Sequence, residues 1–258
     1  VCFKSGLQKD IRTILLASSL IYFNPVVTRS TLANLPDVYI ALIALLGFLF
    51  IKKSTGILTA KRNMLRGFIT ALLLLAGLFV KENIVLIYAG TAIVLFYFRK
   101  TISRHFVFAL ATTVFIGAAG YLFFYYINTG DLFYRFVQIK NAAYFNACSY
   151  QCLPQTELLK RLTVTVPLNA VLTGAYPLLF LIIGLFFSHN KNSSTRFWKI
   201  TFITLFLLAL YFPFSISPYV PLCHDMRQFF FLFPLAVIIF TTRLQETMLN
   251  EKHIRAFR

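Results

Sequence analysis

Four groups of charged residues have types and positions that suit chemistry on a phosphate-bearing substrate. Each group lies at the end of an apolar run. Lys and Arg side chains bind phosphate, and a carboxylate accepts a hydroxyl proton or orients a neighbouring cation. If these run ends face one compartment, the groups would together line a cavity for a substrate with an anionic head and a lipid tail. The four groups are Asp37, Lys81 with Glu82, Asp131, and His224 with Arg227.

Each group also has a purely structural interpretation. Asp37 would be an acidic residue in the first turn of a helix, where it complements the helix dipole. Lys81 and Glu82 would mark a hairpin turn at a membrane interface. Asp131 would cap its own turn, and Arg227 would anchor a helix at the interface. The residues alone leave both interpretations open.

Cys148 and Cys152 are close enough in the segment CSYQC to form a disulfide in an oxidising compartment. Two free thiols are an equal alternative. A zinc site would need more ligands than this segment offers. The sequence does not identify a metal ligand set elsewhere, so the metal requirement stays open.

The composition predicts an all-α bundle of transmembrane helices. The chain is 59% hydrophobic and only 13% charged, whereas soluble domains carry about 25% charged residues. A net charge of +17 often indicates nucleic-acid binding. Here, however, the basic residues form short clusters between apolar runs, which is typical of membrane topology signals. We therefore expect a lipid bilayer, and no nucleic acid, as a partner.

Eight apolar runs are predicted to span the membrane within a single domain, residues 1–258. Several are shorter than the ~20 residues that cross a ~30 Å hydrocarbon core. One long helix over 67–98 is an alternative, but it would place Lys81 and Glu82 in mid-membrane at about 2.5–3.5 kcal/mol per charge. The predicted spans are 13–27, 37–51, 67–81, 83–98, 106–127, 168–188, 200–214 and 229–242.

Charge asymmetry orients these spans. One set of connecting segments holds 18 of the 25 basic residues and three acids, and the other holds seven basic residues and five acids. By the positive-inside rule, the first set is cytoplasmic. All four candidate groups then face the outer side. The longest outer segment is 128–167, where Gln155–Leu162 is predicted to be a short amphipathic helix on the membrane surface.

The chain resembles the multi-span membrane glycosyltransferases of the C-type superfamily (GT-C). The group in question contains the protein mannosyltransferases, the lipid A aminoarabinose transferase and the rhizobial lipopolysaccharide transferases. Leu132 and Gln228 depart from the family pattern, which usually has Pro and Tyr there. The matching patterns, in chain order, are Asn24-Pro25, Leu35-Pro36-Asp37, Gly77-Leu-Phe-Val-Lys81-Glu82, Thr129-Gly130-Asp131-Leu-Phe-Tyr-Arg135, and Arg227 with Pro234.

The resemblance implies transfer of a sugar, with inversion, from a polyprenyl-phosphate donor to a lipid, glycan or protein acceptor. It implies a multi-pass protein of the bacterial inner membrane, with its site facing the periplasm or exterior. Asp37 matches a supporting acid that orients the acceptor or binds a divalent metal. Lys81 and Arg227 match phosphate-binding cations, with Glu82 and His224 beside them.

The family's principal acid lies in a first outer loop, which this chain does not show. Because the chain opens on Val1, we expect it to be the later portion of a longer protein, inactive by itself. Two alternatives remain. One is a transporter or flippase for a lipid-linked or small anionic substrate, and the other is a polysaccharide polymerase or ligase. A transporter would typically show mid-membrane charges and internal repeats, and neither is visible.

Overall fold

The computed structural model is predominantly helical, in agreement with the predicted fold class. The predicted span 13–27 and most of 168–188 lie outside the residues that it describes. Those residues are 36–55, 59–81, 84–143, 156–160, 164–165, 168, 172, 193–216, 219–221 and 229–241.

Six of the predicted spans overlap helices, but the helices over 67–81 and 200–214 begin seven residues before the predicted start, at Ala60 and Ser193, and the second of them ends at Tyr211. The prediction of separate helices before and after Lys81 is confirmed, because α4 ends at Val80 and α5 begins at Ile84. The alternative of one helix over 67–98 is wrong. The helices are α3 (Pro36–Lys53), α4 (Ala60–Val80), α5 (Ile84–Tyr97), α6 (Arg104–Thr129), α11 (Ser193–Tyr211) and Leu232–Thr241.

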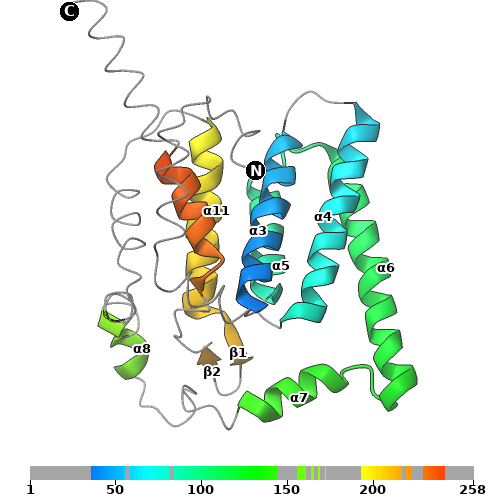
Figure 1. Ribbon diagram of the computed structural model, residues 1–258, viewed down its shortest axis with the longest axis vertical. Coiled ribbons are helices and arrows are strands. Elements are labelled where there is room, and N and C mark those ends of the chain that lie inside the picture. Colours follow the sequence, from blue (N-terminus) through cyan, green and yellow to red (C-terminus); the bar gives the residue numbers. More distant parts are fainter. Residues whose placement is uncertain are drawn as a thin grey trace, which may run out of the picture.

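These helices stand side by side, and the C-terminal end of α6 extends beyond the ends of its neighbours (Figure 1). Helix α3 is central and packs against α4 and α5, while α11 packs against α5. Helix α6 lies at the edge, where it packs chiefly against α4.

Among the described residues, two helices are long and apolar enough to cross a membrane, namely α4 and α6. With 21 and 26 residues, they measure about 31 Å and 39 Å at about 1.5 Å per residue. The core helix of a soluble protein would be mostly buried. In the membrane-length windows, however, only 33% of α4 and 17% of α6 is buried. This exposed apolar surface indicates a membrane protein.

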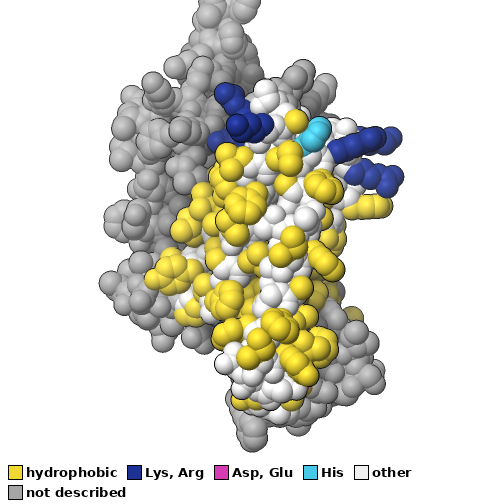
Figure 2. Space-filling view, turned by 90° about the vertical axis from the view of Figure 1, so that its right-hand side faces the viewer, with side chains coloured by type: hydrophobic (Ala, Val, Ile, Leu, Met, Phe, Trp, Pro, Cys, Tyr) yellow, Lys and Arg dark blue, Asp and Glu magenta, His cyan; other side chains and the backbone are white. Residues whose placement is uncertain are grey.

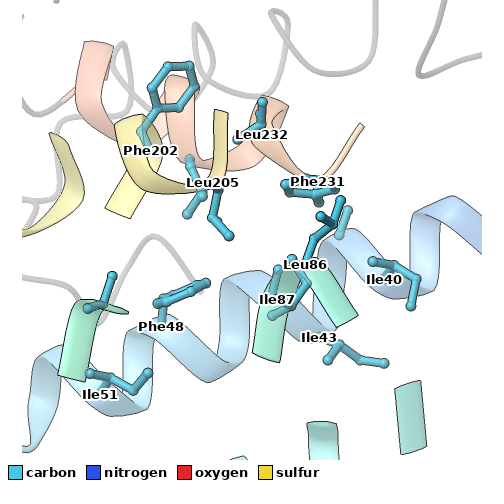
Figure 3. Close-up of a cluster of buried hydrophobic side chains, with 14 of the residues drawn as sticks. Ile40, Ile43, Phe48, Ile51, Leu86, Ile87, Phe202, Leu205, Phe231 and Leu232 are labelled. Carbon is cyan, nitrogen blue, oxygen red and sulfur yellow. The ribbon is translucent and has the colours of Figure 1, made fainter. Parts of the chain in front are cut away.

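The hydrophobic core joins α3, α5, α11 and the start of the last helix (Figure 3). Ile40 and Phe48 of α3 and Leu86 of α5 are at most 2% exposed, as are Leu205 of α11 and Leu232. The core surrounds α3 and leaves much of α6 uncovered. Any polar group on the buried face of α3 therefore needs a partner within the protein.

The loop elements were only partly predicted. Helix α8 (Thr156–Lys160) lies within the predicted surface helix, residues 155–162. Helix α7 (Tyr134–Ala143) and an antiparallel pair of strands, β1 (Pro213–Ile216) and β2 (Tyr219–Pro221), were not predicted. Because both strands of a two-stranded sheet are edge strands, they tolerate proline.

A glycine ends α6 and turns the chain into α7. Gly130 has φ of 74°, and its N–H donates to the Tyr126 carbonyl at 2.9 Å. This left-handed C-cap is one that glycine adopts without steric cost. In the same turn, Asp131 Oδ1 accepts a hydrogen bond from the Phe133 N–H at 2.8 Å.

Basic residues gather at one end of the helices, called the basic end below. Figure 2 shows Lys, Arg and His side chains together above a broad hydrophobic face. In the described ranges, this end holds ten basic residues and no acidic one, as the charge asymmetry predicted. They are Lys52, Lys53, Lys61, Arg62, Arg66, Arg99, Lys100, Arg104, Arg196 and Lys199.

Candidate functional site

The opposite end of the bundle contains a buried ion pair between two of the predicted site residues. Lys81 Nζ lies 2.6 Å from Asp37 Oδ1, although 44 positions separate the two residues. The Asp37 side chain is 6% exposed and the Lys81 side chain is 20% exposed. The ammonium group is thus partly accessible, whereas the carboxylate is almost fully enclosed.

The local sequence places each member of the pair at a helix end. Pro36 begins α3, which puts Asp37 in its first turn, where a carboxylate complements the helix dipole. Lys81 is the C-cap of α4, with an extended backbone, and its N–H donates to the Gly77 carbonyl at 3.1 Å. The Lys81 carbonyl accepts the Ile84 N–H at 3.2 Å, which ties the cap to the start of α5.

Tight packing fixes the position of the Lys81 backbone. A Cβ added to Gly77 would lie 2.5 Å from the side chain of Ile84, so α4 and α5 approach too closely here for any larger residue. Ile84 itself is fully buried. The backbone of Lys81 is therefore held in place by the packing of α4 against α5, and only its side chain can change conformation.

The burial of Asp37 changes the role that suits it. An enclosed carboxylate already bonded to Lys81 is poorly placed to reach an acceptor hydroxyl. It is well placed to hold the ammonium group at a defined point. A cation held in this way is preorganised to receive a phosphate oxygen.

The remaining predicted site residues divide into two sets. Asp131 caps its own turn, which agrees with its structural interpretation. It is exposed, on the turn between α6 and α7. The other predicted residues lie outside the described residues: Glu82, His224, Arg227, Cys148 and Cys152.

Two groups near this end were missed by the sequence analysis. The Arg135 side chain, half-buried on α7, is hydrogen-bonded to the Tyr125 hydroxyl of α6, which also bonds Tyr121. The Tyr88 hydroxyl, one turn into α5, is buried without a hydrogen-bond partner in the described part of the chain. The Thr-Gly-Asp pattern already ended at Arg135 and could have singled it out. Nothing in the sequence distinguishes Tyr88 from other interfacial tyrosines.

The described residues do not assemble a site for the divalent metal that the resemblance implied. Such a cation takes about six or more oxygen ligands, several from the protein. Asp37 offers one carboxylate, which already bonds Lys81. No group of three or more His, Cys, Asp or Glu residues occurs within the described ranges.

Comparison with known proteins does not assign the chain to a family. No family model matches it, and neither the curated proteins nor the solved structures contain a significant match.

Proposed function

We propose that the chain is part of a multi-pass GT-C-like membrane glycosyltransferase with about eight spans in this portion. It would transfer a sugar from a polyprenyl-phosphate donor to a lipid, glycan or protein acceptor. The basic end would face the cytoplasm, and the end with Asp37 and Lys81 would face the outer side of a bacterial inner membrane.

The Asp37–Lys81 ion pair carries this proposal. Burying charges is expensive, and such a pair contributes little net stability compared with well-packed apolar residues. Its presence at the ends of two apolar helices is therefore better explained by a function that needs a fixed cation. The transporter alternative would favour charges in mid-membrane, but this pair lies at the helix ends.

The proposed reaction breaks the bond between the anomeric carbon and the phosphate oxygen. The acceptor oxygen forms the new glycosidic bond, and its proton passes to a carboxylate base. In the resembled family, such a base lies in the first outer loop. Negative charge develops on the departing polyprenyl phosphate, and Lys81 Nζ would stabilise this charge while Asp37 keeps the ammonium group in position.

Arg227 would provide a second cation for the phosphate, because a guanidinium group binds two phosphate oxygens at once. Glu82 and His224 would orient these cations. Cys148 and Cys152 remain a candidate disulfide in the outer loop 128–167.

The direct test is sugar transfer by the full-length protein in membrane vesicles, with a polyprenyl-phosphate sugar as donor. Removing one electrostatic contact to the transition state typically lowers kcat by about 100–1000-fold, and we expect this for Lys81→Ala. Asp37→Asn should also lower transfer, because the cation loses its anchor. Transfer at the wild-type level by both variants would refute the site.

A matched control comes from the exposed ion pair Glu157–Lys160 on α8. Lys160→Ala removes one positive charge from the same predicted side, but the side chain is 61% exposed. It should leave transfer unchanged. Membrane insertion of every variant is checked by protease protection of the outer loops.

A further inference from the structure

A second charged region lies where the basic ends of α4 and α6 meet. The two backbones touch at Gly67, where an added Cβ would lie 2.3 Å from the Phe106 carbonyl oxygen and 3.1 Å from the Leu110 nitrogen. Gly67 is the eighth residue of α4 and Phe106 the third of α6, so the N-terminus of α4 extends about one and a half turns beyond that of α6. The positive ends of the two helix dipoles therefore lie at the same end of the bundle.

The residues at these N-termini increase the positive charge. Lys61 and Arg62 lie in the first turn of α4, and Arg104 begins α6. All three are exposed, and none has a hydrogen bond or ion pair within the described part of the chain. Neither first turn contains an acidic residue. Cations at a helix N-terminus are unfavourable by themselves, so this arrangement favours a bound anion.

The capping groups are also unused by the protein. The N-cap residues Thr59 and Ser103 make no side-chain cap hydrogen bond. Asn63 of α4 is 2% exposed, and its Oδ1 has no partner. It lies one turn before Gly67, on the face that meets α6. Its Oδ1 is thus a buried acceptor whose partner is not among the described residues.

Large apolar side chains lie directly beside these cations. Leu65 and Phe68 on α4 are 56% and 45% exposed, and Phe108 on α6 is 67% exposed. They are about one turn further into the helices than the basic residues. This hydrophobic face continues toward the opposite end (Figure 2). A phosphate group and an acyl chain would therefore be bound side by side.

We propose that the basic ends of α4 and α6 bind the headgroup of an anionic phospholipid in the cytoplasmic leaflet. Lys61, Arg62 and Arg104 contact the phosphate, while Leu65, Phe68 and Phe108 contact the acyl chain. General topology signalling requires only positive charge on this side. The proposed lipid site differs from a topology signal because lipid binding depends on these particular cations. It is independent of the proposed sugar transfer.

The test measures lipids retained by the full-length protein in detergent, by native mass spectrometry after addition of phosphatidylglycerol or phosphatidylcholine. The site variant is Lys61→Gln/Arg62→Gln/Arg104→Gln. The matched control is Lys52→Gln/Arg196→Gln/Lys199→Gln, which removes the same charge from the same end but on α3 and α11. Each lost cation weakens binding about 5-fold, so the loss of three should lower phosphatidylglycerol retention by the site variant about 100-fold.

Retention in the control should change by less than about 2-fold, and Arg62→Lys/Arg104→Lys should keep binding because it keeps the charge. The proposal is overturned by a wild-type protein that retains both lipids equally. It is also overturned by a site variant that keeps phosphatidylglycerol, or by a control that loses as much as the site variant. The site residues are exposed, so the site variants should fold, and monodisperse elution in size-exclusion chromatography verifies folding for these variants and for the control.

Discussion

The two ends of the bundle use charge in opposite ways. The basic end carries ten exposed or half-exposed cations without an acidic neighbour in the described ranges. The opposite end buries one cation against one carboxylate, Lys81 against Asp37. Abundant exposed charge sets topology and can attract lipid headgroups, whereas a single enclosed pair fixes the position of one group. The number of charges at an end is therefore a poor guide to where chemistry takes place.

Removing one member of the buried pair should have the largest effect on stability. Asp37→Asn or Lys81→Met leaves an uncompensated buried charge, which costs about 3–5 kcal/mol. The double variant Asp37→Asn/Lys81→Met removes both charges and should recover most of this loss. Thermal unfolding in detergent micelles measures the three variants, and the cycle isolates the coupling between the two side chains.

Additive losses in that double variant would show that the two side chains act independently. The proposed difference between the two ends of the bundle would then be wrong, because Lys81 would behave like the exposed cations of the basic end. Transfer activity distinguishes stability from function. The double variant should be stable but inactive if Lys81 serves the phosphate.

At the basic end, the strongest constraint is steric. Gly67→Ala places a methyl group against the α6 backbone, so the helices must separate, at about 1–3 kcal/mol. Gly120→Ala on α6 is the matched control, since a Cβ there meets nothing within 4 Å. It should stabilise α6 by about 0.5–1 kcal/mol through helix propensity. Equal unfolding midpoints for the two variants would contradict the close contact at Gly67.

The helices could be predicted from the sequence because their positions depend on apolar runs and charge clusters, which are made of residues close together in the chain. The runs 37–51, 83–98 and 106–127 coincide with helices within about two residues at each end, whereas the helices over 67–81 and 200–214 begin seven residues earlier than predicted. The break after Val80 was predictable because Lys81 and Glu82 are costly in mid-membrane. Helix α7 was missed because its ten residues mix aromatic, basic and amide side chains without a strong apolar stripe. The strand pair was missed because Pro213 and Pro221 argue against strands in most sheets.

The candidate site was predictable in its residues but not in its contacts. Asp37 and Lys81 were singled out because each is a charge at a helix end. Their bond depends on α3 and α4 packing in register, which no local pattern encodes across 44 positions. The enclosure of Asp37 was equally unpredictable, because burial of a helix end depends on neighbouring helices. The resemblance therefore suggested an acid that orients the acceptor or binds a metal, whereas the geometry suits a carboxylate that positions the Lys81 ammonium group.

Removing a single exposed cation from the basic end should have the smallest effect on stability. Lys61→Gln and Arg104→Gln alter exposed side chains without a protein partner in the described ranges, so each should change stability by less than about 0.5 kcal/mol in lipid-free detergent. Adding phosphatidylglycerol should stabilise the wild-type protein, since a ligand that binds only the folded state raises its stability. The same addition should stabilise these variants less. Thermal unfolding with and without the lipid therefore separates the two ends: Lys61 and Arg104 should affect stability only through a ligand, and Lys81 should affect it through Asp37 with no ligand present.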